Sequence, residues 1–116
     1  MEKLTESEEI VMKAVWDCEK TPVLSMVTER TTRDYGKDWR PQTVSTFLAK
    51  LVRKNYLQLC RNGKIYTYKT LITEAAYRRE LYREHIRFWN HGNTVGLIKE
   101  MLDNGDISMK ELEEIL

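Results

Sequence analysis

Residues 39–54 of the chain are Trp39-Arg40-Pro41-Gln42-Thr43-Val44-Ser45-Thr46-Phe47-Leu48-Ala49-Lys50-Leu51-Val52-Arg53-Lys54. Proline suits the first position of a helix, where its missing N–H would have no partner, and no Gly or Pro follows before Gly63. With about 100° of rotation per residue, the apolar side chains share one face, and Phe47 lies at its edge. This face comprises Val44, Leu48, Leu51 and Val52. The pattern predicts a helix that begins near Pro41 and packs on a core.

The opposite face of this helix is polar near its start and cationic farther along. Its outward positions are Gln42, Thr46, Ala49 and Arg53, flanked by Thr43, Ser45 and Lys50. Short hydrogen-bonding side chains followed by cations suit a helix that lies in the major groove of DNA. Many amphipathic surface helices carry Lys and Arg and bind nothing, so the helix alone is a weak signal.

Residues 56–69 strengthen this interpretation because they contain two alternating runs around Asn62-Gly63, the best short signal of a β-hairpin. Arg61 and Lys64 flank the expected turn. A basic hairpin after a basic helix is the order of a winged helix, in which the second helix of a helix-turn-helix enters the groove and the hairpin, or wing, lies on the DNA backbone. The sequence predicts a mostly α fold with a small β-hairpin (α+β), built around a winged helix-turn-helix DNA-binding domain.

The composition bounds the class of protein. A chain of 116 residues with 41% hydrophobic content suits one small domain with an appendage. No run approaches the roughly 18 apolar residues of a membrane span, and the first residues lack the apolar stretch of a signal peptide, so we expect a cytoplasmic protein without a membrane partner. Cys18 and Cys60 lack C-x-x-C spacing, which favours packed, reduced thiols over a disulfide or a metal site. We expect no cofactor.

The net charge of +1 conceals a segregation of charge along the chain. Residues 29–69 contain ten Lys and Arg against three Asp and Glu, a net charge of +7. Residues 1–28 and residues 70–116 each have a net charge of −3. The positive charge therefore coincides with the proposed helix and hairpin, as expected for a surface that binds nucleic acid.

The segments that flank this centre are helical by pattern. Thr5 with Glu8 forms a capping box for a first helix, and residues 23–33 suggest a shorter second helix. The chain then turns through residues 34–38, a longer connection than the tight turn of a simple helix-turn-helix. We assign residues 1–72 to the winged-helix domain.

We assign residues 73–116 to a helical dimerisation region. A long helix from Thr73-Glu74 to about His91 has two apolar faces, and two shorter helices follow, from Thr94 to Leu102 and after a capping box of Ser108 with Glu111. One small domain cannot bury all these faces, so we expect a second copy of the chain to cover them. The residues expected at the dimer contact are Tyr77, Leu81, Tyr82, Ile86, Phe88, Trp89, Leu97, Ile98, Leu102, Leu112 and Ile115.

Other functions are less well supported. His85 and His91, the only histidines, fall on different faces of the long helix, and no set of nucleophile, base and orienting group can be assembled around either, so we expect no enzyme. The alternatives are a winged helix that acts as a protein-interaction module or as an RNA-binding module without operator specificity. RNA recognition generally needs aromatic stacking platforms, whereas the aromatic residues here occupy mainly apolar positions.

With these elements assembled, the chain resembles the penicillinase-repressor (BlaI/MecI-type) family, bacterial winged-helix repressors of β-lactam resistance genes that act as homodimers. The segments that carry the resemblance are Ile10-Val11-Met12-Lys13-Ala14-Val15-Trp16, Trp39-Arg40-Pro41-Gln42-Thr43-Val44, Leu51-Val52-Arg53-Lys54-Asn55-Tyr56-Leu57, Gly63-Lys64-Ile65-Tyr66-Thr67-Tyr68 and Leu112-Glu113-Glu114-Ile115-Leu116. The resemblance implies a recognition helix over residues 42–54, a wing over residues 61–65 and a double-stranded DNA operator as partner. Copper-responsive relatives end in paired C-x-C motifs, which this chain lacks after Cys60.

Two groups of residues follow from the helix pattern and the resemblance together. The side chains expected to face base edges are Gln42, Thr43, Ser45 and Thr46, and those expected to contact phosphates are Arg40, Lys50, Arg53, Arg61 and Lys64. The family usually has a small polar residue before the proline. Arg40 in that place weakens the helix cap but adds a cation near the backbone.

The resemblance also implies a regulatory protease that ends repression by cutting an Asn-Phe bond in the helix after the long one. Alignment on the closing helix puts this bond at Glu100-Met101, where neither side chain matches. Because a protease pocket tuned to a side chain discriminates strongly, the changed pair argues for a different sensor or none. Release could instead come from another protease, a ligand or a partner protein. Mass spectrometry after incubation with a resistance-type sensor protease should find this bond intact, and a clean cut there would contradict the expectation.

Overall fold

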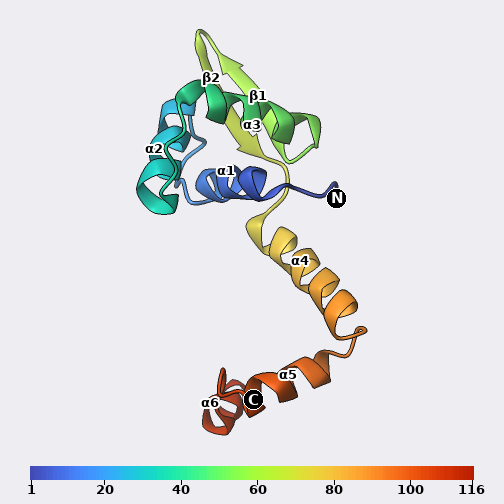
Figure 1. Cartoon of the computed structure of the whole chain (residues 1–116). Coiled ribbons are helices and arrows are strands. Elements are labelled where there is room, and N and C mark those ends of the chain that lie inside the picture. The colour runs from blue at the N-terminus through green and yellow to red at the C-terminus, as the bar shows by residue number, and fades with distance from the viewer. The chain divides into compact units, whose positions relative to one another are not determined.

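The computed structural model describes residues 1–116, which form two compact units, Met1–Glu74 and Ala75–Leu116. The elements, in chain order, are α1 (Glu6–Trp16), α2 (Leu24–Tyr35), α3 (Pro41–Arg53), β1 (Leu57–Asn62), β2 (Ile65–Thr70), α4 (Glu74–Trp89), α5 (Thr94–Asp103) and α6 (Met109–Ile115) (Figure 1). Three helices followed by an antiparallel hairpin are the elements of a winged helix, so the predicted fold is confirmed. The functional roles assigned to residues 1–72 and 73–116 stay predictions.

The core of the first unit is made where α1 packs against α2 and α3 (Figure 1). The predicted inner face of α3 is confirmed, because Val44, Leu48 and Leu51 are fully buried, while Val52 is half-buried. The other apolar side chains of this core are Leu4, Val11, Met12, Ala14, Val15, Val27, Tyr56, Leu57 and Tyr68. Burial of this kind contributes about 1.5–3 kcal/mol for each large apolar side chain. It determines which face of α3 is left for solvent.

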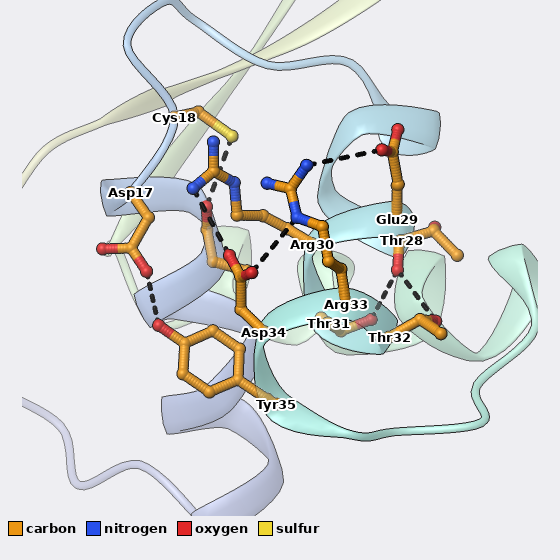
Figure 2. A network of polar contacts seen from close by, with 11 residues as sticks. Asp17, Cys18, Thr28, Glu29, Arg30, Thr31, Thr32, Arg33, Asp34 and Tyr35 are labelled. Carbon is orange, nitrogen blue, oxygen red and sulfur yellow. Dashed lines mark hydrogen bonds and ion pairs between the residues drawn. The ribbon is translucent and has the colours of Figure 1, made fainter.

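Helix α2 is longer than its pattern indicated. We expected a turn from residue 34, but the helix continues through Asp34 and Tyr35 and ends at Gly36, which takes the left-handed conformation with φ 65°. Figure 2 shows why the last turn holds: Asp34 accepts from Arg30 (3.4 Å) and Arg33 (3.1 Å), and the Tyr35 hydroxyl donates to Asp17 at the end of α1. Burial and this carboxylate both raise the pKa of Tyr35. The network therefore ties α2 to α1.

The hairpin has the predicted place but a turn shifted by one residue. Asn62 pairs with Ile65 and belongs to the ladder, so the two turn residues are Gly63 and Lys64 instead of Asn62 and Gly63. Gly63 has φ 67°, a conformation that glycine adopts without the steric cost of a Cβ and that matches the twist of a two-residue hairpin. The backbone N–H of Tyr68 donates to the Pro22 carbonyl (3.1 Å), which ties β2 to the segment between α1 and α2.

An ion pair joins the start of α1 to the end of α3. The Lys54 ammonium lies 2.7 Å from the Glu8 carboxylate, whose side chain is 2% exposed, and it also donates to the Lys3 carbonyl (3.0 Å). Glu8 completes the predicted capping box with Thr5, which is confirmed. Burial alone would raise the pKa of Glu8, but the hydrogen bonds from Lys54 and Thr5 outweigh it and hold this pKa below its ordinary value. The pair therefore fixes the C-terminal end of α3.

The second unit has no core of its own. None of the residues of α4, α5 and α6 is buried. The predicted capping box of Ser108 and Glu111 is confirmed at the start of α6, and Asn93 caps α5 through a bond from the Gly96 N–H (3.0 Å). None of the helices combines the length and apolar character that a bilayer span requires.

Loss of the Glu8–Lys54 pair should destabilise the protein. We expect Glu8→Ala to lower the free energy of unfolding by about 1.5–3 kcal/mol at neutral pH, because Lys54 loses a charged hydrogen-bond partner. A carboxyl whose folded pKa is depressed stabilises above its unfolded pKa, so wild-type stability should fall as the pH drops below the ordinary value of 4.5, and Glu8→Gln should flatten this dependence. Urea unfolding followed by circular dichroism measures both. The control is Glu6→Gln, an exposed position in the same helical turn, and equal midpoints for the two Gln variants would contradict the assignment.

Candidate nucleic-acid interface

The outward face of α3 is available to a partner. The predicted contact residues of this segment that are exposed are Arg40, Gln42, Thr43, Thr46, Lys50 and Arg53, whereas Ser45 is half-buried. The Thr46 hydroxyl donates to the Gln42 carbonyl (3.1 Å), so its methyl group and lone pairs remain for a partner. The structure thus brings the predicted base-facing group together on one helix. Their contacts with bases stay a prediction.

The start of α3 has the electrostatic character of an anion-binding end. Arg40 is the N-cap and provides no side-chain cap, as its sequence position suggested, and the first turn contains no acidic residue. The first N–H groups of a helix have no intrahelical partner and carry a partial positive charge. With Arg40 beside them, they favour a negatively charged partner such as a phosphate.

The wing carries two cationic side chains, Arg61 and Lys64, which differ in how firmly contacts within the hairpin hold them. The Arg61 Nε donates to the Gly63 carbonyl (2.8 Å), and its guanidinium lies 5.6 Å from the centre of the Tyr66 ring, its cross-strand neighbour. Arg61 is therefore held at the tip by two contacts within the hairpin. Lys64 is an exposed residue of the two-residue turn. In Figure 1 the turn between β1 and β2 projects beyond the helices of this unit, and both Arg61 and Lys64 are exposed.

Three residues of this surface, Lys37, Trp39 and Phe47, were not among the contact residues predicted from the sequence. The rings of Trp39 and Phe47 are in contact at a tilt of 48°, with centroids 5.1 Å apart, and the Lys37 ammonium lies 5.4 Å from the centre of the Trp39 ring. The Lys50 ammonium lies 5.7 Å from the centre of the Phe47 ring. The sequence pattern did place Phe47 at the edge of the apolar face of α3. Periodicity within a helix cannot show that Phe47 contacts Trp39, because Trp39 lies before the helix.

The predicted dimer residues are partly exposed and none is buried. The most exposed are Tyr82 (57%), Phe88 (72%), Trp89 (71%) and Ile115 (73%). Phe88 and Trp89, consecutive residues of α4, meet edge to face with ring centroids 4.8 Å apart. Side chains of this size are usually buried, so their exposure marks an incomplete apolar surface.

The thiols and acidic residues do not form a reactive centre. The chain contains no group of three His, Cys, Asp or Glu side chains placed to hold a metal ion. Both cysteines are free thiols. The Cys18 thiol donates to the Ala14 carbonyl (3.3 Å), and burial raises its pKa, which is the opposite of what activates a nucleophilic cysteine.

The fold and this surface define a winged-helix protein whose exposed helix and wing are basic. A more specific identification comes from comparison with known proteins, since the family model of the penicillinase repressor matches residues 4–116. The chain belongs to the penicillinase repressor family, whose members are transcriptional regulators and not enzymes.

Relatives of known identity agree with this assignment. The methicillin resistance regulatory protein MecI of Staphylococcus aureus (strain N315) is 23% identical over 113 residues, which cover 97% of this chain and 89% of that protein. The penicillinase repressor of Bacillus licheniformis is 24% identical over 115 residues, which cover 97% of this chain and 86% of that protein. The solution structure of monomeric B. licheniformis BlaI in complex with the blaP half-operator matches with a TM-score of 0.53 and 25% identity, over 66% of this chain and 89% of that one.

Proposed function

We propose that the chain is a sequence-specific DNA-binding repressor that acts as a homodimer on an inverted-repeat operator. The observation that carries the proposal is the outward face of α3, where exposed hydrogen-bonding side chains are followed by cations and the basic wing lies in the same unit. The related BlaI was solved bound to a half-operator, which supports a duplex DNA partner.

The base-facing group suits the major groove. In this proposal Gln42 hydrogen-bonds a base edge, for which adenine is the usual partner of an amide side chain, and the Thr46 methyl group contacts thymine. Thr43 and Ser45 contact bases at the two sides of the helix. Gln42 and Thr46 lie one turn apart on the outward face, so they would read neighbouring positions.

The phosphate-facing group supplies affinity without sequence preference. Its members are Arg40, Lys50, Arg53, Arg61 and Lys64. Each phosphate that a cation neutralises releases a counterion, so binding should weaken steeply as salt rises. This group lies on both α3 and the wing, and together they would fix the orientation of the helix in the groove.

The proposed dimer is supported by the second unit, because none of the residues of α4, α5 and α6 is buried within a single chain. In this proposal two copies pack α4, α5 and α6 of one chain against those of the other around a two-fold axis, and a two-fold protein matches an inverted repeat. The residues at this contact are the eleven predicted from the sequence. Residues 73–116 would form the dimerisation region and residues 1–72 the DNA-binding domain.

Base readers and phosphate contacts should separate by mutation. Against duplexes selected by the wild-type chain from a random-sequence pool, Gln42→Ala or Thr46→Ala should change the preference between bases at one position by about 1–3 kcal/mol. Lys64→Ala should weaken all duplexes alike and reduce the salt slope by about one per half-site. Fluorescence anisotropy on single-base variants measures both, and Lys110→Ala, an exposed lysine of α6, is the control. A uniform loss from every variant would refute the assignment of base readers.

The second unit should be necessary for full affinity. Analytical ultracentrifugation of the whole chain should give the mass of a dimer, and Phe88→Asp should shift it toward a monomer, because a charge would then be buried at the contact. Glu84→Gln on the same helix is the control. A chain that ends at Thr73 should bind a half-site but lose most of the affinity for a full operator. A monomeric mass for the whole chain, or full affinity in the shortened one, would rule out the dimer.

A further inference from the structure

Four side chains make a row of successive contacts, in the order Lys37, Trp39, Phe47 and Lys50, and the last two lie on one flank of α3. The centroids of the two aromatic rings are 5.1 Å apart and the ring planes are inclined by 48°. The Lys37 ammonium lies 5.4 Å from the centre of the Trp39 ring, and the Lys50 ammonium lies 5.7 Å from the centre of the Phe47 ring. We call this row the cation–aromatic row. Only Lys50 of these four belongs to the predicted contact residues.

The row lies at the border between the core and the solvent. Phe47 and Trp39 are half-buried, Lys37 is half-buried, and Lys50 is exposed. Along the helix, Phe47 and Lys50 fall on the same side of the outward face as Thr43. The half-buried rings of Trp39 and Phe47 therefore lie between the apolar core and the surface proposed to contact bases.

The segment before α3 holds the first half of the row in place. Gly36 ends α2 in the left-handed conformation, and the Lys37 N–H donates to the Thr31 carbonyl (3.1 Å), so the backbone of Lys37 is bound to the end of α2. Trp39 directly precedes the N-cap of α3. Lys37 thus comes from the connection before α3 and Lys50 from α3 itself, and the two rings lie between them in the series of contacts.

The position of the row matches the place where phosphates run. A helix about 10–12 Å across fills a major groove about 12 Å wide, so its outward face meets bases and its flanks meet the sugar-phosphate backbones. Lys50 lies on one flank of α3, and the two rings connect it to Lys37, so both ammonium groups would meet the same backbone. A lysine ordered before binding loses less side-chain entropy when it binds a phosphate.

We propose that Lys37 contacts a DNA phosphate and that the Trp39–Phe47 pair is a positioning element that holds Lys37 and Lys50 along one backbone of the bound duplex. This inference rests on the proposed function. It adds a contact that charge and periodicity did not identify, and it assigns the aromatic pair a role in DNA binding besides packing the start of α3.

The test uses the full chain and mixed-sequence duplex DNA, because phosphate contacts do not depend on base sequence. Lys37→Gln should weaken binding and reduce the slope of log K against log salt by about 0.9 for each bound chain. Lys110→Gln in α6 is the matched control and should leave the slope unchanged. A slope for Lys37→Gln equal to that of wild type would overturn the proposal while leaving the proposed function intact. Absence of duplex binding by the wild-type chain would overturn both.

The role of the rings is tested by a double-mutant cycle. Trp39→Leu should weaken binding about two- to fivefold with little change in slope, and Trp39→Phe should restore most of this loss, because a ring is again present. In a Lys37→Gln, Lys50→Gln background, Trp39→Leu should have almost no further effect, since the ring acts through the lysines. The same loss in both backgrounds would show a purely structural role and overturn this part of the proposal. Thermal unfolding of each variant shows whether α3 remains folded.

Discussion

The packing of α3 on α1 is the constraint on which the rest of the structure depends. Val44, Leu48 and Leu51 have no exposed surface, so the helix cannot rotate without opening the core. That burial directs Gln42 and Thr46 to solvent. The Glu8–Lys54 pair limits the remaining freedom at the end of the helix. A surface helix that is fixed in this way can present the same side chains to every partner, which recognition of a base sequence requires.

Much of the first unit follows from local pattern. Periodicity and Pro41 predicted α3 and its buried face, and the two capping boxes marked the starts of α1 and α6. What the pattern missed depends on contacts between distant residues. The last turn of α2 is held in part by Asp17, and the hairpin turn is displaced because Asn62 joins the ladder with Ile65. Trp39 was missed for the same reason, since its partner Phe47 belongs to the next element.

The second unit differs in kind from the first. The capping box at the start of α6 is the one that the sequence predicted, yet none of the residues of α4, α5 and α6 is buried, and Phe88 and Trp89 remain more than two-thirds exposed. Their periodicity predicts amphipathic helices but contains no information about what covers them. The proposed second copy would bury this apolar surface and would also place two recognition helices on one operator. Stability and specificity would then come from the same contact.

We propose that α3 and the wing together form a surface for duplex DNA. The most direct measurement is a salt titration of binding by the whole chain to duplex DNA and to single-stranded RNA of the same length. We expect tight duplex binding whose log K falls linearly and steeply with log salt, and clearly weaker binding to the RNA. Equal affinity for both nucleic acids, or no duplex binding at low salt, would contradict it.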